Sequence, residues 1–181
     1  MQIVTIVGSL RKDSYNKRIA LFMQERYRGK LDMDILYLNN LPLFNVDMED
    51  DPPEAVKEFK EKIRNAEGIL IVSPEYNHSI PGGLKNALDW CSRGDRVLVK
   101  KPVFMVGASD GNVGTARMQG QLHQILNAPG VAALTLPGNH VLIPNVQNDF
   151  DESGDYANQR TIKYLDKVVD GFLAWSKQIY C

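Results

Sequence analysis

Two segments carry most of the residues that could take part in chemistry. The first runs from Pro74 to Gly82 and presents an acid, an aromatic ring and an amide at Glu75, Tyr76 and Asn77. Its prolines restrict the backbone, so these groups are held in place at a low entropy cost. Such side chains, together with the backbone N–H groups between them, can hold a planar ligand that has polar edges.

The second segment, residues 8–16, is rich in groups that bind phosphate. Gly8 allows the backbone to turn tightly. A helix that follows such a loop points its free N–H groups and its positive dipole end at the same place. The side-chain donors available in the segment are Ser9, Arg11, Ser14 and Asn16. The alternative is an ordinary turn in which Asp13 or Ser14 caps the helix and Arg11 lies in solvent.

Both segments follow apolar runs that are typical of buried strands. The pattern predicts strands at 2–7, 33–38, 68–73, 102–108 and 131–136, and helices at 14–28, 54–65, 82–92, 114–127 and 156–179. Strands that alternate with helices predict an α/β protein with a five-stranded parallel sheet covered on both faces, as a three-layer sandwich. We expect residues 1–181 to form one domain.

A third loop follows the predicted strand 102–108 and contains Ser109 and Gly111. In open parallel sheets, ligands bind beyond the carboxyl ends of the strands, where the strand order reverses. With the strand order 2-1-3-4-5, strands one, three and four are neighbours, so their three exit loops meet. The sequence therefore predicts one cleft for a planar, phosphorylated cofactor.

Several residues near these loops admit two interpretations. Glu75 could act as an acid or base, or it could make a structural hydrogen bond. His78 could contact a ligand or lie on the surface. Cys91 is expected to be a buried, inert thiol on the helix that follows.

The composition excludes several classes of protein. A formal net charge of −1 gives no basic field for nucleic acid. Two cysteines make no disulfide framework and fit a reducing compartment. The chain shows no signal-peptide pattern, and no apolar run reaches the roughly 18 residues of a membrane span. We therefore expect a cytoplasmic protein with neither nucleic acid nor a membrane as partner.

Side chains for independent catalysis are missing. Three dispersed histidines and two cysteines give no zinc pattern, so no metal site is expected. A Gly-x-Ser-x-Gly elbow is also absent. No nucleophile–base pair can be found, which is typical of an enzyme whose cofactor carries the reaction.

The two loops resemble those of the NAD(P)H-dependent FMN reductase family, which includes quinone, azo-dye and chromate reductases. The resemblance rests on Gly8-Ser9-Leu10-Arg11 with Ser14-Tyr15-Asn16, and on Pro74 to Gly82 with Leu84-Lys85-Asn86-Ala87-Leu88-Asp89-Trp90. It covers roughly residues 1–135 and implies a flavodoxin-like fold.

The resemblance also implies the cofactors and their site. FMN would be bound without a covalent link, and NADPH or NADH would be the reductant. Ser9, Arg11, Ser14 and Asn16 would hold the phosphate, Pro74, Glu75, Tyr76 and Asn77 would line the ring, and Ser109 and Gly111 would complete the site. Quinones, azo compounds, metal oxyanions or free flavin would be the small-molecule acceptors.

Family members are typically homodimers or homotetramers. The loop 39–53 and the helix 82–92 would form the interface, with Phe44 and Met48 either roofing a partner's flavin or packing under their own loop. The alternative function is that of a flavodoxin-type electron carrier or a flavin-binding regulatory module that oxidises no nicotinamide itself. Electron carriers are usually strongly acidic, so the near-neutral charge favours the reductase.

Overall fold

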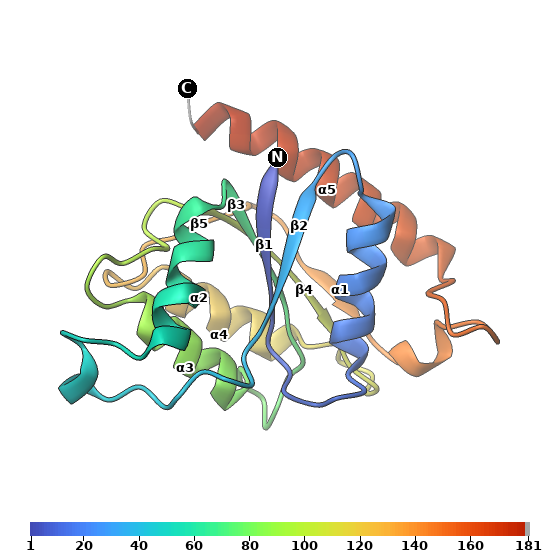
Figure 1. Ribbon diagram of the computed structural model, residues 1–181. Helices are drawn as coiled ribbons and strands as arrows, with labels where there is room; N and C mark the ends of the chain where they lie inside the picture. The colour runs from blue at the N-terminus through green and yellow to red at the C-terminus, as the bar shows by residue number, and fades with distance from the viewer. Residues whose placement is uncertain (180–181) are drawn as a thin grey trace.

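A parallel sheet with helices on both faces organises the protein (Figure 1), whose computed structural model describes residues 1–179. The strands are β1 (Gln2–Val7), β2 (Asp32–Tyr37), β3 (Gly68–Val72), β4 (Pro102–Ala108), β5 (Leu134–Thr135) and β6 (Val141–Ile143). The helices are α1 (Tyr15–Arg26), α2 (Glu54–Asn65), α3 (Gly82–Cys91), α4 (Ala116–Leu126) and α5 (Gln159–Ile179), with short 3-10 turns at Val46–Met48 and Val146–Asn148.

The strand order is β2-β1-β3-β4-β5, with β6 also paired to β4, and all pairs are parallel. The predicted flavodoxin-like α/β fold and its strand order are confirmed. The number of strands differs from the prediction, because the sheet has six strands rather than five.

The extra strand arises because the position of the fifth strand is divided in two. A strand at 131–136 was predicted, but only Leu134 and Thr135 pair, and they reach only the start of β4. β6 pairs with the end of β4, at Val106 to Ala108. Between the two strands the Asn139 side chain donates to the Met105 carbonyl at 3.1 Å, in the place of a backbone N–H group.

The terminal helix starts later than predicted, at Gln159 rather than at residue 156. The preceding segment forms a loop that is closed by an isolated bridge between Phe150 and Tyr156. Asn158 then caps the helix, since its side-chain oxygen accepts from the N–H groups of Arg160 and Thr161. The other long elements lie within about two residues of their predicted bounds, which is the usual uncertainty at helix ends.

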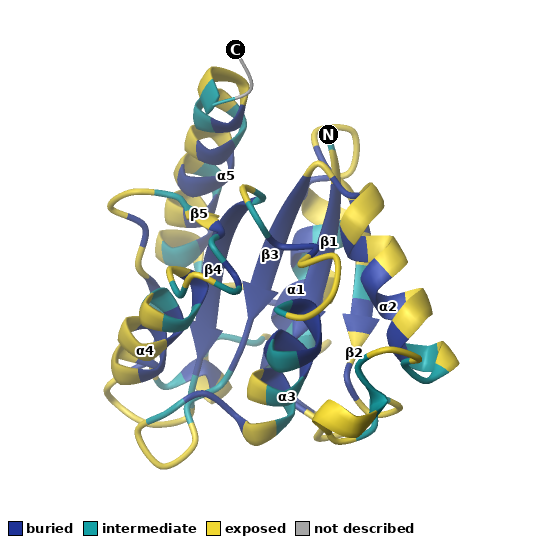
Figure 2. Ribbon diagram, turned by 90° about the vertical axis from the view of Figure 1, so that its left-hand side faces the viewer, coloured by how far each residue is buried: buried dark blue, intermediate teal, exposed yellow. Residues whose placement is uncertain are grey.

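Each face of the sheet has its own apolar core. Residues of α2, α3 and α4 pack on one face, and residues of α1 and α5 pack on the other. Figure 2 shows the strands buried between helices whose outer faces are exposed. β3 and β4 are buried throughout, because they lie in the centre of the sheet with helices on both sides.

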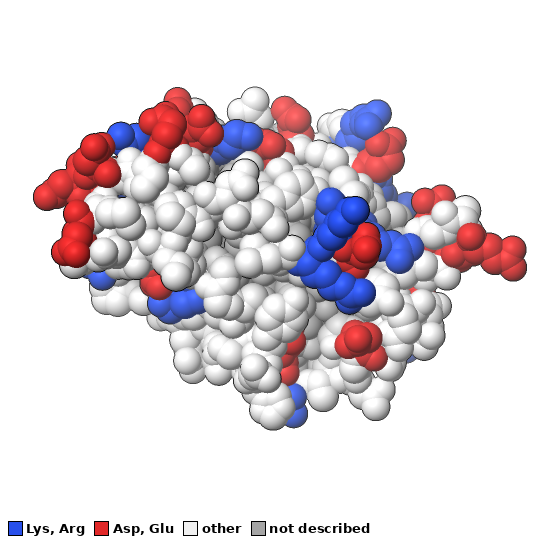
Figure 3. All heavy atoms as spheres, turned by 60° about the horizontal axis from the view of Figure 1, so that its bottom comes forward, with Lys and Arg blue, Asp and Glu red and all other residues white. Residues whose placement is uncertain are grey.

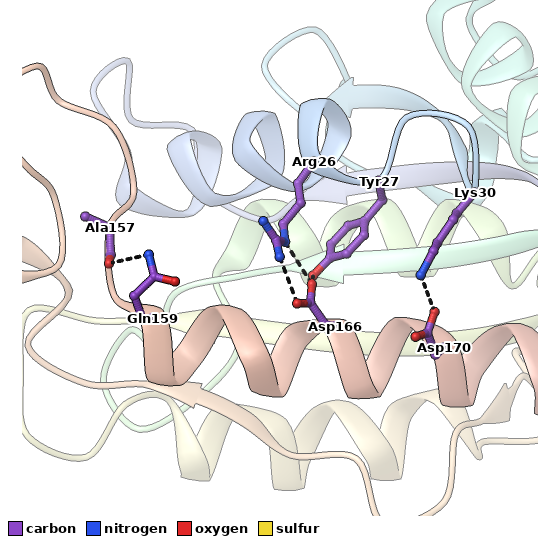
Figure 4. Close-up of polar contacts among 7 residues, drawn as sticks. All are labelled: Arg26, Tyr27, Lys30, Ala157, Gln159, Asp166 and Asp170. Atoms are coloured by element: carbon purple, nitrogen blue, oxygen red, sulfur yellow. Dashed lines mark hydrogen bonds and ion pairs between the residues drawn. The ribbon is translucent and has the colours of Figure 1, made fainter.

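Polar contacts join the end of α1 and the turn after it to α5 at the surface (Figure 4). Arg26 donates two hydrogen bonds of 2.8 Å to Asp166, and Tyr27 Oη donates a third at 3.0 Å. Lys30 reaches Asp170, one helical turn further along α5, at 2.7 Å. The hydrogen bond from Arg26 is the main reason why the pKa of Asp166 is lowered. Because these side chains are partly exposed, each ion pair contributes at most about 1 kcal/mol to stability.

The loop 39–53 is fastened to α3 at its start. The Pro42 carbonyl accepts hydrogen bonds from Asn86 Nδ2 and Trp90 Nε1, both at 2.9 Å. The Phe44 ring then packs edge-on against Trp90, with 5.0 Å between the ring centroids. Phe44 therefore packs under its own loop.

Candidate functional site

Three loops leave the sheet side by side because their strands have their carboxyl ends at the same level. Val7 of β1 is in register with Val72 of β3, which is in register with Val106 of β4. A cavity of about 110 Å³ lies between the loops. Its lining comprises Ser9, Arg11, Ser14, Tyr15, Asn16, Pro74, Glu75, Tyr76, Ala108, Ser109 and Asp110.

Eight of the ten predicted site residues therefore line one cavity, and Asn77 and Gly111 lie outside it. The prediction did not include Tyr15, Ala108 and Asp110. Tyr15 and Asp110 each follow a predicted site residue directly. Ala108 ends the buried β4 and offers only its backbone, so no side-chain pattern could have indicated it.

The first loop lies close against the second because residue 8 has no side chain. A Cβ atom at Gly8 would overlap the Ser73 hydroxyl. The Gly8 N–H group donates instead to the Val72 carbonyl at 2.9 Å. Gly8 thus continues the contact between β1 and β3 into the loops, whereas the sequence predicted a tight turn at this position.

The start of α1 offers donors that the protein itself leaves unused. Ser14 is the N-cap residue, but its side chain makes no capping hydrogen bond to the helix. The N–H groups of the first turn have no partner within the helix. Ser14, Tyr15 and Asn16 line the cavity, so this helix end borders it together with the Ser14 hydroxyl. Arg11 is exposed at the same rim and makes no ion pair within residues 1–179. This set of donors suits an anion that has several oxygens.

Ser9 joins the first loop to the second. It is buried, and its hydroxyl accepts from the Arg11 N–H group at 3.3 Å. The same oxygen lies 3.5 Å from Tyr76 Oη. The Tyr76 ring is 48% exposed and so forms part of an open surface beside the cavity.

Asn16 is engaged with the end of β4. Its side-chain nitrogen donates to the Ala108 carbonyl at 2.9 Å, and its side-chain oxygen accepts from the Ala108 N–H group at 3.0 Å. The pair imitates a strand ladder and holds the start of α1 against β4. The predicted contact between Asn16 and a phosphate stays a prediction, and the structure gives its side chain a positioning role.

The second loop turns through a two-residue hairpin. Asn77 and His78 both have positive φ angles, 49° and 64°. Tyr76 and Ser79 exchange backbone hydrogen bonds of 3.0 and 2.9 Å across the turn. Positive φ at both central positions is typical of a type I′ turn, which asparagine tolerates well. The turn accounts for the position of Asn77 outside the cavity.

Glu75 holds the second loop to the start of α4. Its carboxylate accepts from the N–H groups of Arg117 and Met118, both at 3.0 Å, and from the Arg117 guanidinium at 3.2 Å. Burial alone would raise the pKa of Glu75, but these hydrogen bonds outweigh it and the pKa is lowered. Glu75 is therefore ionised at neutral pH, and the structural interpretation of this residue fits the geometry.

The third loop is held by the segment after β6. The N–H group of Ser109 donates to the Ile143 carbonyl at 3.0 Å, and the N–H group of Asn145 donates to the Gly111 carbonyl at 3.2 Å. Within the loop, the Gly111 N–H group donates to the Ser109 hydroxyl at 3.0 Å. Sequence reasoning missed this support because it missed β6.

Cys91 lies on α3 and is fully buried. Burial raises the pKa of its thiol to about 12, so the thiol stays protonated. The other cysteine, Cys181, lies outside the described residues.

A family model for NADPH-dependent FMN reductases matches residues 1–148 of the chain. The chain belongs to this family. That membership agrees with the three loops and with the unused donors at the start of α1.

Similar proteins extend the match over almost the whole reductase chain. It is 35% identical to the NADH:(hydroxy)cinnamate reductase subunit CrdA of Vibrio ruber, over 99% of this chain and 89% of the relative. It is 37% identical to the 2-hydroxy-1,4-benzoquinone reductase of a Burkholderia species, over 97% and 96% of the two chains. A solved structure, the flavoenzyme NAD(P)H:(acceptor) oxidoreductase FerB of Paracoccus denitrificans, superimposes with a TM-score of 0.86 at 31% identity, over 98% and 97% of the two chains.

The geometry of this reductase fits FMN. A cavity of about 110 Å³ is much smaller than the usual pocket for a whole cofactor, so it suits only the phosphate end. The ring would then lie on the open surface beside Tyr76. Figure 3 views the face with the three loops, where a group of basic side chains surrounds an acidic one. Within residues 1–179, no helix is long and apolar enough to cross a membrane.

Proposed function

We propose that this chain is an FMN-dependent NAD(P)H oxidoreductase that reduces small acceptors, with quinones as the leading class. The observation that carries the proposal is the convergence of three loops on a phosphate-sized cavity next to an open aromatic surface. The related benzoquinone reductase supports quinones as acceptors. Azo compounds, metal oxyanions and free flavin remain acceptors to test.

Each loop has a distinct task in the proposed site. Ser9, Arg11, Ser14 and the first-turn N–H groups of α1 hold the phosphate, while Asn16 fixes this helix end to β4. The backbone from Pro74 to Asn77 and the Tyr76 ring line the isoalloxazine, and Ser109 and Gly111 close the third side. When bound, FMN supplies the acceptance and release of hydride.

The residues at the site supply binding and orientation rather than acid–base chemistry. Glu75 is ionised and its oxygens are occupied by α4, so it has no proton to give at neutral pH. Backbone N–H groups near the ring favour negative charge there. Because the Tyr76 side is open, solvent can deliver protons, and acceptors of different shapes can approach.

The proposal also covers the domain organisation, the location and the assembly of the protein. Residues 1–181 form one flavodoxin-like FMN-binding domain, and the protein works in the cytoplasm as a homodimer or homotetramer. On the loop 39–53, Leu43 is 81% exposed and Val46 is 60% exposed, whereas Phe44 and Met48 are partly buried. Leu43 and Val46 are therefore the better candidates for contact with a second copy.

One experiment tests the function. The purified protein is expected to show flavin absorption bands, and to oxidise NADPH or NADH when menadione or a benzoquinone is added. A protein that binds FMN but oxidises neither nicotinamide would be an electron carrier. Absence of flavin, with no rescue by added FMN, would refute the proposal.

A further inference from the structure

Two further cavities lie beside α1, outside the cofactor cavity. The first has a volume of about 540 Å³ and adjoins the cofactor cavity, with which it shares Arg11, Ser14 and Tyr15. The second has a volume of about 650 Å³ and lies between α1 and the loop before α5. The two cavities share Arg18 and Leu21.

The two cavities follow the same face of α1 and together form one groove. Ser14, Arg18, Leu21 and Glu25 follow one another at intervals of three or four residues, so they lie on one face of the helix. With a rise of about 1.5 Å per residue, the path from Ser14 to Leu21 is about 10 Å long. Figure 1 shows the loop before α5 beside α1, and residues of that loop line the second cavity. The groove therefore leads away from the proposed phosphate site of FMN.

The first half of the groove is cationic. Lys12, Lys17 and Arg18 line it, and Asp13 is the only acidic residue in its lining. Lys12 and Lys17 make no ion pair within the described part of the chain, and Lys17 Nζ lies 4.9 Å from the centre of the Tyr37 ring. Several cations without ion-pair partners along one cavity suit a ligand that has two adjacent phosphates.

The second half has the character of a pocket for a purine. Phe22, Phe150 and Tyr156 provide aromatic surface. The Arg18 guanidinium lies 3.5 Å from the centre of the Phe150 ring and donates to the Gly154 carbonyl at 2.6 Å, which holds this wall in place. Aromatic rings and a guanidinium plane are the surfaces on which bases stack.

Carboxylates complete the second half. Glu25 and Asp155 also line it. Carboxylate oxygens accept hydrogen bonds, and the exocyclic amino group of adenine donates them. The lining of the groove thus changes from mainly cationic to aromatic with balanced charge, because Arg18 and Arg26 accompany the two carboxylates. This is the order in which a diphosphate and an adenine follow each other in a nucleotide.

We propose that the groove along α1 binds the adenosine diphosphate half of the nicotinamide dinucleotide. Lys12 and Lys17 meet the diphosphate, and the adenine enters between α1 and the segment 150–156. This inference rests on the proposed function, because it concerns the reductant of the same site. It assigns a role to the basic residues that the FMN phosphate does not need.

The test compares reductants with and without this half. The FMN-loaded protein is assayed with NADPH, NADH and reduced nicotinamide mononucleotide, which lacks the adenosine diphosphate. In the double variant Lys12→Gln/Lys17→Gln, the KM for both dinucleotides is expected to rise about fivefold to twentyfold at low salt. Leu21→Glu, which places a negative charge at the junction of the cavities, is expected to act in the same direction. The KM for the mononucleotide serves as the internal reference and is expected to stay the same.

Lys163→Gln/Lys167→Gln on α5 is the matched control, because it removes the same charge away from the groove. An unchanged KM in the Lys12/Lys17 variant, an equal rise for the mononucleotide, a rise for NADPH alone, or an equal effect of the α5 control would each overturn the inference.

Calorimetry with ADP separates this inference from the proposed function. ADP is expected to bind the FMN-loaded parent, and to bind the Lys12/Lys17 variant more weakly by the same factor. This result would support the groove even if the protein oxidised no nicotinamide. No binding of ADP to the parent at millimolar concentration would overturn the inference while leaving the reductase function standing.

Discussion

Polar residues of the site that seem equivalent in the sequence differ in whether their donor and acceptor atoms already have partners within the protein. Glu75 and Asn16 line the cavity of the proposed site, but their polar atoms bind α4 and β4. Arg11 and Ser14 lie in the same cavity with their side-chain donors unspent. A ligand can gain a strong hydrogen bond only from the second kind of residue, while the first kind sets the shape of the site.

Arg11→Ala is therefore expected to weaken the binding of FMN directly. The loss of one charge-assisted contact with the phosphate should cost about 1.5–3 kcal/mol, or about a tenfold to hundredfold rise in Kd. Fluorescence titration of the apoprotein with FMN measures it. Arg160→Ala, which changes an exposed arginine on α5, is the control and should leave the Kd unchanged. Equal affinities of the Arg11 variant and the parent would remove Arg11 from the site.

Glu75→Gln is expected to lower stability in a pH-dependent way. The pKa of Glu75 in the folded protein lies below its ordinary value of 4.5, so the ionised form stabilises the fold. That contribution is present above the ordinary value and is lost as the pH falls through the lowered folded pKa. We expect a loss of about 1–3 kcal/mol in the free energy of unfolding at neutral pH, which shrinks on acidification.

Urea titrations of the parent and Glu75→Gln, at neutral pH and again below the ordinary pKa of glutamate, measure this difference. Glu152→Gln, at an exposed position, should change stability little at either pH. A difference for Glu75→Gln that stays constant on acidification would contradict the role of the ionised carboxylate.

At the scale of elements, the divided edge of the sheet supports the third loop. β5 pairs with the start of β4, β6 pairs with its end, and the chain leaves the ladder between them. The Asn139 side chain fills this gap by donating to the Met105 carbonyl. β6 then places Ile143 and Asn145 where they bind the third loop. The edge of the sheet is thus part of the framework of the site.

Asn139→Ala is expected to destabilise the protein by about 1–3 kcal/mol, because the buried Met105 carbonyl loses its donor. The free energy of unfolding in urea measures the effect. Asn148→Ala, at an exposed position in the turn after β6, should change stability by less than about 0.5 kcal/mol. Equal effects of the two substitutions would show that the gap in the ladder needs no side chain.

At the scale of the whole molecule, the proposed interface between copies involves exposed apolar residues on the loop 39–53. Leu43 is 81% exposed, yet it follows Pro42, whose carbonyl is held by two donors of α3. A large apolar side chain on a fastened loop gains from burial against another surface. This feature supports the proposal of a homo-oligomer.

Leu43→Asp is expected to shift the assembly toward monomers, because the interface would have to bury an unpaired charge. Sedimentation velocity at micromolar concentration follows the change. Tyr164→Asp, which alters an exposed aromatic on α5, is the comparison and should leave the assembly unchanged. A parent protein that sediments as a monomer would contradict the proposal.

The sequence by itself determined the alternation of strands and helices and the three loops that line the cavity. These features depend on local signals: runs of apolar residues, helical spacing, and glycines and prolines at turns. Eight of the ten predicted site residues line one cavity because loops after parallel strands must leave the sheet at the same edge.

Only the tertiary structure decided which polar atoms stay available, where the edge strand divides and where the groove beside α1 runs. Asn16 meets Ala108 across 92 positions of sequence, and Glu75 meets Arg117 across 42. Strands of two or three residues, such as β5 and β6, are too short to show the alternation of apolar and polar residues that identifies a strand in a sequence. Partners so distant in the chain become neighbours only through packing, which no local pattern in the sequence records.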